Sequence, residues 1–456
     1  MTKVMKFGGS SLRDGPSMTM VGEIVADDDE PRVVVVSACQ GVTNEILRFM
    51  SSHHREEDIQ PFISDLRGRH MDILRDVTTS MDTRKSSLDA LLGHLTRLER
   101  IMYGITYLEE LTPRTSDLAQ SYGERMSSIL VAAMLTDMGV NAVAVDADEL
   151  GIVTDERFGQ ASADIEATRR NIAPRVQEML ERDEVPVVTG YFGVTPNGHV
   201  ALFGRNGTDY SAAVIANAMG ADSLEIWKDV DGFLSVDPRV VPDAVPLDCL
   251  SYEEAAELAY YGAGILHPRC VEPAKQMGIA INLRNVFSPS AKGTVIRSGC
   301  DVTKDGIKSI SFLRGMSVVN AYGAGAGYEL GVLARTYSGL SASGINVYSS
   351  ASSQTCISVL IDSRDKPMAE PILRELKRGI IDETEIVDGV ALVCVVGDGL
   401  DAIKGMEARV FRSVAEADVN IEMFSANANG VAYHFVVRDD DLETTVMAVH
   451  DEFFGP

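Results

Sequence analysis

Short apolar runs recur along the first two thirds of the chain, and stretches with helical periodicity lie between most of them. The runs that we expect to form strands are residues 4–7, 32–37, 141–145, 185–190, 223–227 and 279–286. Strands that alternate with helices predict an α/β fold, with an open, mostly parallel sheet sandwiched by helices. A charged stretch, residues 58–110, predicts a helical hairpin that could overhang a site as a lid. Ligands bind such sheets beyond the carboxyl ends of the strands, so the residues that follow each run are candidates for a functional site.

The first strand end carries the sequence from Lys6 to Ser11, in which Gly8 and Gly9 are adjacent. The glycine pair permits a tight turn and the close approach of a ligand to the backbone. Residues 11–25 have helical periodicity, and a helix beginning here would offer unpaired N–H groups to a phosphate. Lys6 precedes the glycines, whereas the lysine of a P-loop follows them, so this is not a P-loop. Taken alone, the pattern also fits a plain turn.

Later stretches add groups that an acidic substrate and a nucleotide require. Residues 37–44 are small and hydroxyl-bearing, although a loop with a helix N-cap has the same composition. Glu124 lies in the first turn of a helix, where it could merely complement the helix dipole. Residues 203–211 form a glycine-rich turn before a helix, and Arg205 in this turn can clamp a carboxylate with two hydrogen bonds. Residues 227–239 combine an aromatic side chain, cations and several carboxylates, more than a turn requires.

Composition and charge restrict the function classes. The chain of 456 residues has a formal net charge of −26, which disfavours nucleic acid as a partner. The same charge repels ATP and acidic metabolites, so a site for them must supply local cations and Mg²⁺. No apolar run reaches the length of a membrane span and no signal pattern opens the chain, so we expect a cytoplasmic protein with no membrane partner. The cysteines are scattered without a Cys-x-x-Cys pair, which argues against a structural zinc site and favours free thiols.

The C-terminal third follows a polar linker at about residues 299–306 and contains an internal repeat with a period of about 74 residues. Each unit predicts strand, helix, strand, strand and helix, a pattern that resembles paired βαββαβ-type ACT domains, which bind amino acids. The second unit lacks a closing strand, and we expect residues 307–313 to supply it. Residues 323–327 mimic a dinucleotide fingerprint, but the following strand lacks the acid that would bind a ribose. We expect this loop to hold an effector's carboxylate, with Asn346 and Gln354 in reach, although packing between ACT units is the alternative.

Together these stretches resemble the aspartate kinases of the amino acid kinase family. The matching motifs follow the family's order and lie at residues 6–11, 37–44, 123–124, 205–211, 227–239, 262–268 and 293–294. The resemblance implies a kinase domain over residues 1–298 and ACT domains over 307–385 and 386–456. It also implies ATP-dependent phosphorylation of the side-chain carboxylate of L-aspartate to 4-phospho-L-aspartate, the first step towards lysine, threonine and methionine. ATP and Mg²⁺ would be the cofactors, lysine or threonine the possible effector, and a homodimer or higher homo-oligomer the assembly.

The resemblance also implies a role for each matching residue. Lys6 would contact the phosphates and stabilise the transition state, supported by Gly8, Gly9 and Ser10. Asp209 would orient the catalytic lysine or the metal, and no residue is assigned as a metal ligand.

The remaining roles concern the two substrates. Thr43, Glu124, Arg205 and Thr208 would bind aspartate, with the arginine on a carboxylate and the glutamate on the ammonium group. Trp227 is expected to pack rather than to stack on the nucleotide. The residues that would line the nucleotide are Lys228, Asp229, Leu234, Arg239, Gly264 and Ile265.

Three positions depart from the family pattern. Ser10 replaces the usual threonine and keeps the hydroxyl group. Asn206 replaces a common glycine, which asparagine tolerates where φ is positive. Gly264 stands where many relatives carry a phosphate-contacting lysine, so we expect Lys228 or another cation to compensate. Two alternatives therefore stay open: a non-catalytic amino-acid sensor with a decayed kinase site, and another amino acid kinase such as glutamate 5-kinase.

Overall fold

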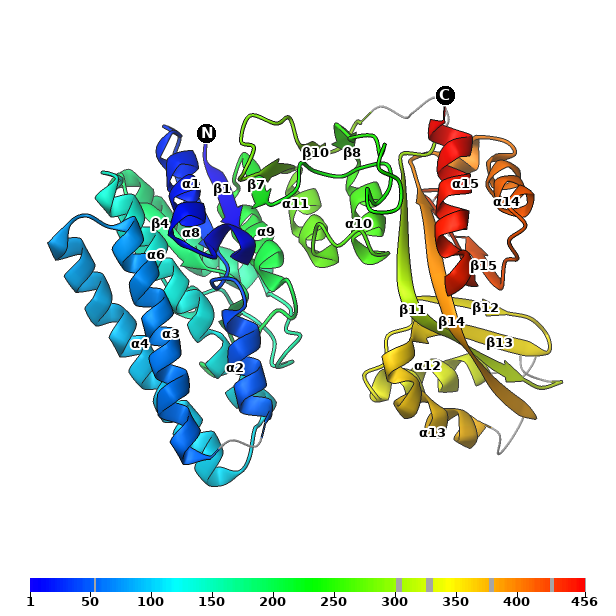
Figure 1. Ribbon diagram of the computed structural model, residues 1–456, viewed down its shortest axis with the longest axis horizontal. Helices are drawn as coiled ribbons and strands as arrows, with labels where there is room; N and C mark the ends of the chain where they lie inside the picture. Colours follow the sequence, from blue (N-terminus) through cyan, green and yellow to red (C-terminus); the bar gives the residue numbers. More distant parts are fainter. Residues whose placement is uncertain (53–54, 301–305, 325–330, 377–380, 427–429, 456) are drawn as a thin grey trace. The chain divides into compact units, whose positions relative to one another are not determined.

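The computed structural model describes residues 1–456 apart from 53–54, 301–305, 325–330, 377–380, 427–429 and 456. The chain divides into two compact units, which we describe separately (Figure 1). The first unit comprises Met1–Phe233, Asp248–Tyr252 and Ile265–Gly299. The second comprises Leu234–Leu247, Glu253–Gly264 and Cys300–Pro456. The domain limits expected from the sequence stay a prediction.

The first unit is built on a sheet that, among the described residues, has eight strands in the order β3-β4-β2-β1-β7-β9-β10-β8. Its strands are β1 (Lys3–Phe7), β2 (Arg32–Val36), β3 (Ala142–Val145), β4 (Val185–Thr189), β7 (Ser223–Lys228), β8 (Cys249–Leu250), β9 (Ala280–Asn285) and β10 (Thr294–Ile296). Neighbouring strands are parallel except for the pair β9 and β10. The open, mostly parallel sheet expected from the apolar runs is thus confirmed. A separate antiparallel pair is formed by β5 (Phe192–Val194) and β6 (Val200–Leu202).

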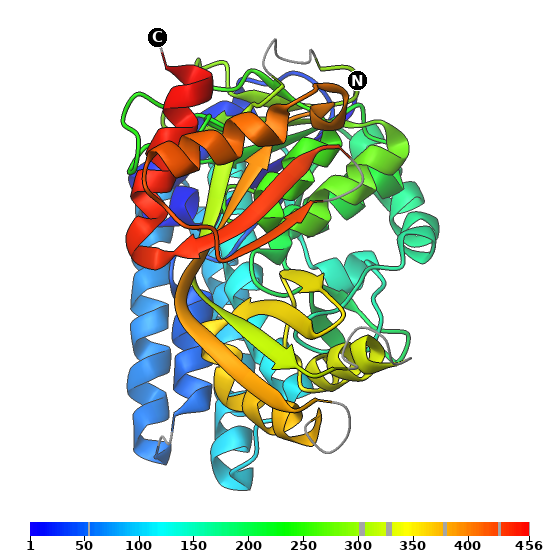
Figure 2. The same ribbon diagram turned by 90° about the vertical axis from the view of Figure 1, so that its right-hand side faces the viewer.

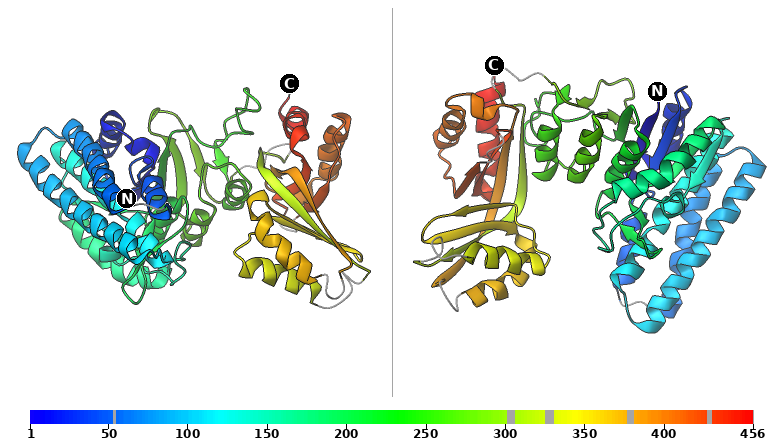
Figure 3. Two further views of the ribbon diagram at one scale, coloured as in Figure 1. Left: turned by 60° about the horizontal axis from the view of Figure 1, so that its bottom comes forward. Right: turned by 180° about the vertical axis from the view of Figure 1, so that it is seen from behind.

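Helices cover both faces of this sheet (Figures 1 and 3). One face is packed by α1 (Gly15–Ala26), α3 (Glu56–Val77) and α6 (Tyr122–Asp137), which also pack on one another. On the other face α9 (Gly207–Met219) contacts β1, β2 and β7, flanked by α8 (Ile165–Glu181) and α11 (Val271–Met277). The remaining helices are α2 (Val42–Ser51), α4 (Met81–Leu108), α5 (Pro113–Gln120) and α7 (Ala147–Leu150). The expected helical hairpin is confirmed as α3 and α4, which pack against each other, whereas its role as a lid stays a prediction.

The helix expected at residues 11–25 begins later than the sequence suggested. A short 3-10 turn, η1 (Gly9–Leu12), follows the glycine pair, and α1 begins at Gly15. The side chain of Asp14 accepts a hydrogen bond from the backbone N–H of Ser17 at 2.8 Å, which caps α1 at this point. Pro16 in the first turn fits this start because its missing N–H needs no partner there. The glycine turn therefore does not lead directly into a long helix.

The second unit contains an antiparallel sheet of six strands among the described residues, in the order β12-β13-β11-β14-β16-β15 (Figure 2). The strands are β11 (Ser309–Tyr322), β12 (Ser349–Ser352), β13 (Cys356–Asp362), β14 (Glu383–Val396), β15 (Met423–Ala426) and β16 (Ala432–Arg438). The helices are α10 (Tyr252–Tyr260), α12 (Val332–Ala342), α13 (Lys366–Leu376), α14 (Met406–Glu416) and α15 (Leu442–Phe454). Each repeat therefore has the expected order of strand, helix, strand, strand and helix.

The long strand β11 serves both repeats. Its first half, residues 309–313, pairs with residues 392–396 of β14, and its second half pairs with β13 and with the start of β14. The register shifts beyond Leu313, where Gly315 has a φ of 69°. The additional strand that we expected at residues 307–313 is thus confirmed, and the sheet of the second repeat is completed from the chain that precedes the first.

Segments that precede the linker also belong to the second unit. Val236 is buried in the apolar core formed by β14, β16, α14 and α15. Glu254 of α10 accepts a hydrogen bond from the ammonium group of Lys308 at 2.9 Å, and these residues are 0% and 3% exposed. A buried ion pair therefore anchors α10 to the residue that immediately precedes β11.

The cysteines correct one expectation. Cys39, Cys270, Cys356 and Cys394 are free thiols, but Cys249 and Cys300 are disulfide-bonded. Spacing along the chain carried no sign that either cysteine forms a disulfide.

In the part of the chain that the structure describes, no helix is long and apolar enough to cross a membrane.

Candidate active site

Three charged side chains meet at the carboxyl ends of two neighbouring strands of the first unit. Lys6 lies near the end of β1, Lys228 ends β7, and Asp209 lies in the first turn of α9. Asp209 Oδ1 is 2.7 Å from Lys6 Nζ, and Asp209 Oδ2 is 2.9 Å from Lys228 Nζ. The backbone N–H of His267 donates a third contact, to Asp209 Oδ2 at 3.1 Å. One buried carboxylate thus holds two ammonium groups.

This network carries local positive charge in a strongly acidic protein. Lys6 is 4% exposed and Asp209 is 1% exposed. Burial opposes ionisation of Asp209, but Lys228 and Lys6 outweigh it and hold the pKa of the carboxyl group well below its usual range. The carboxylate therefore stays charged and fixes the positions of both amines. Burial lowers the pKa of Lys6, and the neighbouring Asp209 opposes that effect. With both amines protonated, the network has a net positive charge available to a phosphate.

Gly8 lies beside Lys6 of this network, and Gly9 lies beside the loop that follows β2. A Cβ atom added at Gly8 would lie 3.4 Å from Lys6 Nζ, and one added at Gly9 would lie 2.9 Å from the carbonyl oxygen of Ala38. Glycine at these positions therefore keeps the turn close to the lysine and to the loop after β2. Ser10 is half-buried in η1, and its predicted role stays a prediction.

A second group of predicted residues lies beside Ala38. Glu124 is 3% exposed, and its Oε1 accepts a hydrogen bond from the Ala38 N–H at 3.1 Å. Its Oε2 is buried without a hydrogen-bond partner among the described residues. Burial raises the pKa of Glu124 to about 8. Thr43 adjoins the same helix, because a Cβ atom added at Gly123 would lie 3.3 Å from its Oγ1.

The turn before α9 places the other predicted substrate residues. Thr208 is 4% exposed and packs so tightly on Gly190 that a Cβ atom there would lie 2.2 Å from the Thr208 methyl carbon. Asn206 has a φ of 61°, as expected for a residue in place of glycine. Arg205 is exposed, and it precedes the helix whose first turn carries Asp209. An exposed guanidinium at this end of the sheet is available to a ligand.

The residues that were predicted to line the nucleotide are divided between the two units. Besides Lys228, the first unit holds Asp229, which is exposed, and Ile265, which is half-buried. Leu234, Arg239 and Gly264 belong to the second unit. Arg239 is paired with Asp237 at 2.5 Å, and Gly264 has a φ of 64°.

The contact between the backbone N–H of His267 and Asp209 was not predicted from the sequence. The stretch 262–268 was recognised as a motif, but the donor is a backbone N–H, which nearly every residue carries. No signal in the sequence could therefore have assigned this role to His267.

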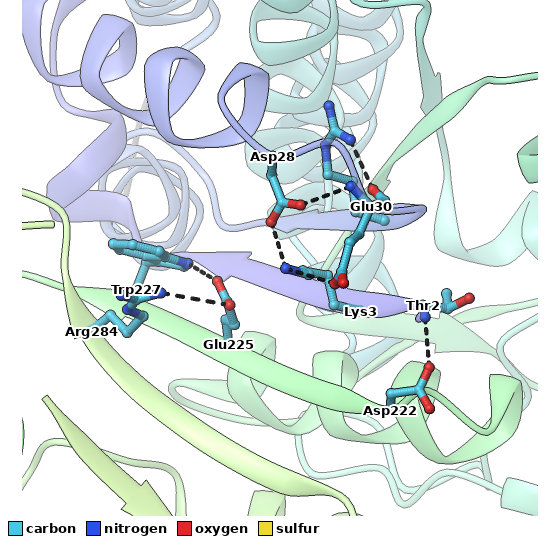
Figure 4. A network of polar contacts seen from close by, with 9 residues as sticks. Thr2, Lys3, Asp28, Glu30, Asp222, Glu225, Trp227 and Arg284 are labelled. Carbon is cyan, nitrogen blue, oxygen red and sulfur yellow. Dashed lines mark hydrogen bonds and ion pairs between the residues drawn. The ribbon is translucent and has the colours of Figure 1, made fainter. Parts of the chain in front are cut away.

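Trp227 and Lys228 are adjacent in β7, so their side chains point to opposite faces of the sheet. Figure 4 shows Trp227 beside Glu225 and Arg284. Its Nε1 donates to Glu225 at 2.9 Å, and the guanidinium of Arg284 lies 4.9 Å from its ring centroid. The ring also stacks on Phe7 at a centroid distance of 6.1 Å. A cavity of about 820 Å³ is bordered by Glu225, Trp227 and Arg284, and Lys3 and Met5 also line it. The expectation that Trp227 packs rather than binds the nucleotide is consistent with its 3% exposure.

The predicted effector loop lies partly outside the described residues, because 325–330 are not among them. Gly323 donates its N–H to the carbonyl oxygen of Thr355 at 2.9 Å. Asn346 donates to the hydroxyl group of Tyr260 at 3.1 Å, and Gln354 is exposed. The role of this loop stays a prediction.

Comparison with known proteins identifies relatives over the whole chain. A model of the amino acid kinase family matches residues 1–285, and a model of the ACT domain matches residues 393–453. Aspartokinase 1 of Arabidopsis thaliana, named as chloroplastic, is 32% identical over 467 residues that cover 100% of this chain and 80% of that protein. The aspartokinase of Schizosaccharomyces pombe is 28% identical over 488 residues, covering 99% of this chain and 93% of that protein.

Solved structures agree with these relatives. Aspartokinase III of Escherichia coli in complex with aspartate and ADP is 27% identical, with a TM-score of 0.86 and 100% of both chains covered. The same enzyme in complex with lysine and aspartate gives a TM-score of 0.80 over 99% of both chains, at 27% identity. The chain therefore belongs to the aspartokinases of the amino acid kinase family.

Proposed function

We propose that this protein transfers the γ-phosphoryl group of ATP to the side-chain carboxylate of L-aspartate, as the first step towards lysine, threonine and methionine. The observation that carries the proposal is the placement of Lys6 and Lys228 on one buried carboxylate, Asp209, at the ends of β1 and β7. Two anions must meet for this reaction, and they require fixed positive charge. The relative from Escherichia coli, which was solved with aspartate and ADP, supports the same pair of ligands.

The chemistry matches the groups that are present. A carboxylate is already nucleophilic, so the reaction needs positioning and charge neutralisation rather than a general base. Lys6, held by Asp209 below the glycine turn, would neutralise charge on the transferring phosphoryl group. Lys228 would contact the nucleotide phosphates and supply the charge that Gly264 does not. Asp209 would keep both amines in place during the transfer.

Aspartate would bind between the helix α6 and the turn before α9. Glu124 has a buried oxygen without a hydrogen-bond partner among the described residues, which an ammonium group would satisfy. Arg205 would pair with a carboxylate of the substrate, and Thr43 and Thr208 would complete the subsite. The ammonium group and one carboxylate of aspartate would then each meet an opposite charge.

Mg²⁺ fits this arrangement as a companion of ATP. The ion is commonly held by substrate phosphates and water, and no side chain is assigned as its ligand, because both oxygens of Asp209 already contact Lys6, Lys228 and the N–H of His267. When bound, Mg²⁺ would supply further neutralisation of the triphosphate charge.

Regulation and assembly follow from the paired repeats of the second unit. We propose that lysine or threonine binds these repeats, since the relative from Escherichia coli was also solved with lysine. We also propose a homodimer or higher homo-oligomer in a cytoplasmic setting.

Aspartate-dependent release of ADP tests the proposal. The expected result is release that requires ATP, Mg²⁺ and aspartate, and that glutamate does not support. Lys6→Ala should lower kcat by about two to three orders of magnitude, as loss of a transition-state contact does. Lys3→Ala is the matched control, because Lys3 lies on the same strand but on the other face, paired with Asp28 at 2.7 Å. Equal kcat values for the two variants would refute the role of Lys6.

The assay also separates the alternatives. Arg205→Ala should raise the KM for aspartate, and an effect confined to ATP would mean that the subsites are exchanged. Turnover with glutamate in place of aspartate would indicate a different amino acid kinase. Binding of lysine or threonine without any turnover would indicate a sensor whose kinase site has decayed.

A further inference from the structure

A buried carboxylate outside the charged network joins the two halves of the proposed aspartate subsite. Asp117 lies in α5 and is 2% exposed. Its Oδ2 accepts hydrogen bonds from the backbone N–H groups of Gly159 at 2.7 Å and Leu202 at 2.9 Å. The structure gives no ion pair between Asp117 and a cationic side chain among the described residues. Asp117 therefore binds backbone rather than a counter-charge.

The elements that Asp117 joins each lead to a proposed substrate residue. On its own side, α5 continues through Ser121 into α6, which carries Glu124 in its first turn. On the other side, Leu202 ends β6 and is followed by the turn that contains Arg205. Asp117 thus connects α5, which leads into the helix of Glu124, directly to the strand that leads into the turn of Arg205.

Gly159 extends the connection to the turn itself. A Cβ atom added at Gly204 would lie 3.3 Å from the Gly159 carbonyl oxygen, so the loop around Gly159 packs against the residue before Arg205. The same loop is tied to β6 by a hydrogen bond from the Ala161 N–H to the Leu202 carbonyl at 2.8 Å. Displacing either N–H from Asp117 would therefore move the turn that presents Arg205.

A second hydrogen bond braces α5 at the same place. The hydroxyl group of Tyr191 donates to Oε1 of Gln120 at 3.2 Å. The Tyr191 carbonyl accepts from the Phe203 N–H at 2.8 Å, and its own N–H donates to Ser211 Oγ at 2.8 Å. Gln120 cannot replace Asp117, however, because it contacts a side chain rather than the backbone of β6.

We infer that Asp117 is a positioning residue that sets the separation of Glu124 and Arg205 and thereby the affinity for aspartate. The inference rests on the proposed function, since it assigns those residues to the substrate. Burial raises the pKa of Asp117 to about 6, so the group is ionised at neutral pH. An ionised acceptor makes stronger hydrogen bonds to N–H groups than a neutral one.

The test compares Asp117→Ala and Asp117→Asn by steady-state kinetics of the full chain. Asp117→Ala should raise the KM for aspartate at least tenfold and leave the KM for ATP within about twofold, because a tenfold change corresponds to the loss of one such interaction. Asp117→Asn keeps an acceptor oxygen and should recover most of the aspartate affinity. This rescue is a readout that mere loss of stability would not produce.

Asp137→Ala is the matched control. Asp137 also accepts two backbone hydrogen bonds, from Thr79 at 2.8 Å and Ser80 at 2.7 Å, but it ends α6 and ties it to the turn between α3 and α4. Its loss should lower the melting temperature and leave the KM for aspartate unchanged. If Asp117→Ala behaves like this control, the inference is wrong.

The remaining outcomes are also decisive. If Asp117→Ala does not fold, the smaller loss of affinity that remains in Asp117→Asn must still appear in the KM for aspartate rather than in the KM for ATP, and equal changes would overturn the inference. If the unmodified protein releases no ADP with aspartate, the proposed function fails. In that case titration calorimetry with aspartate replaces the kinetic test, and an unchanged dissociation constant in the variants overturns the positioning role separately.

Discussion

The pH dependence of aspartate binding follows from the burial of Glu124. Burial raises the pKa of its carboxyl group to about 8, and no cationic side chain hydrogen-bonds to it among the described residues. The neutral form therefore prevails at pH 7 in the free protein. An ammonium group binds the ionised form, so aspartate must drive off a proton before Glu124 can hold it. Affinity should accordingly rise with pH until Glu124 is ionised and then level off.

The magnitude follows from the fraction of ionised Glu124. For a pKa of about 8, that fraction is about 3% at pH 6.5 and about 75% at pH 8.5, and the apparent dissociation constant scales inversely with it. The dissociation constant for aspartate should therefore fall about 25-fold over this range. At pH 7 the binding of one aspartate should release about 0.9 protons, the fraction of Glu124 that is still protonated.

Titration calorimetry measures both quantities. Heats recorded at pH 7 in two buffers of different ionisation enthalpy give the number of protons released, and a series from pH 6.5 to 8.5 gives the affinity profile. Glu124→Gln is the control, because glutamine cannot ionise. At high pH this variant should bind aspartate more weakly than the unmodified protein does, and binding should release no proton. A dissociation constant that stays flat over the range, with no proton released by the unmodified protein, would refute the assignment of Glu124 to the ammonium group.

Further expectations concern the ion pairs. Asp209→Ala leaves the ammonium groups of Lys6 and Lys228 close together without their shared carboxylate. Urea unfolding should show a loss of stability of about 3–5 kcal/mol, the range for broken buried pairs. An unchanged urea midpoint would contradict the network. Lys228→Met removes the proposed phosphate contact and should raise the KM for ATP about tenfold. An increase in the KM for aspartate alone would instead mean that Lys228 belongs to the aspartate subsite. Lys308→Met removes the ammonium group 2.9 Å from Glu254. In the same urea assay the second unit should lose about 3–5 kcal/mol of stability. Replacing both residues by apolar ones should recover much of this loss.

Local patterns predicted most of the fold. Strands that are buried on both faces need uninterrupted apolar runs, and the runs at residues 32–37 and 185–190 became β2 and β4. The repeat in the last third revealed the order of elements in the second unit, and the missing strand could be assigned because one apolar segment was left over. The start of α1 was misplaced, since helical periodicity continues through η1 and only the cap at Asp14 marks the boundary.

Side-chain chemistry at strand ends likewise predicted part of the site. The resemblance to the aspartate kinases brought Lys6, Asp209 and Lys228 together, and parallel strands place Lys6 and Lys228 at one edge of the sheet. Leu234, Arg239 and Gly264 could not be placed in the same way. Their segments leave the first unit and pack with the second, a choice made by contacts such as the burial of Val236.

The sequence alone determined the elements, the family and the identity of the charged residues, because strand burial, glycine turns and charge are properties of neighbouring residues. Only the tertiary structure decided that Asp117 binds the backbone of Gly159 and Leu202, and that the N–H of His267 completes the contacts of Asp209. These contacts join segments distant along the chain through backbone N–H groups. Every residue except proline carries such a group, so no pattern of side chains can indicate which of them a buried carboxylate will bind.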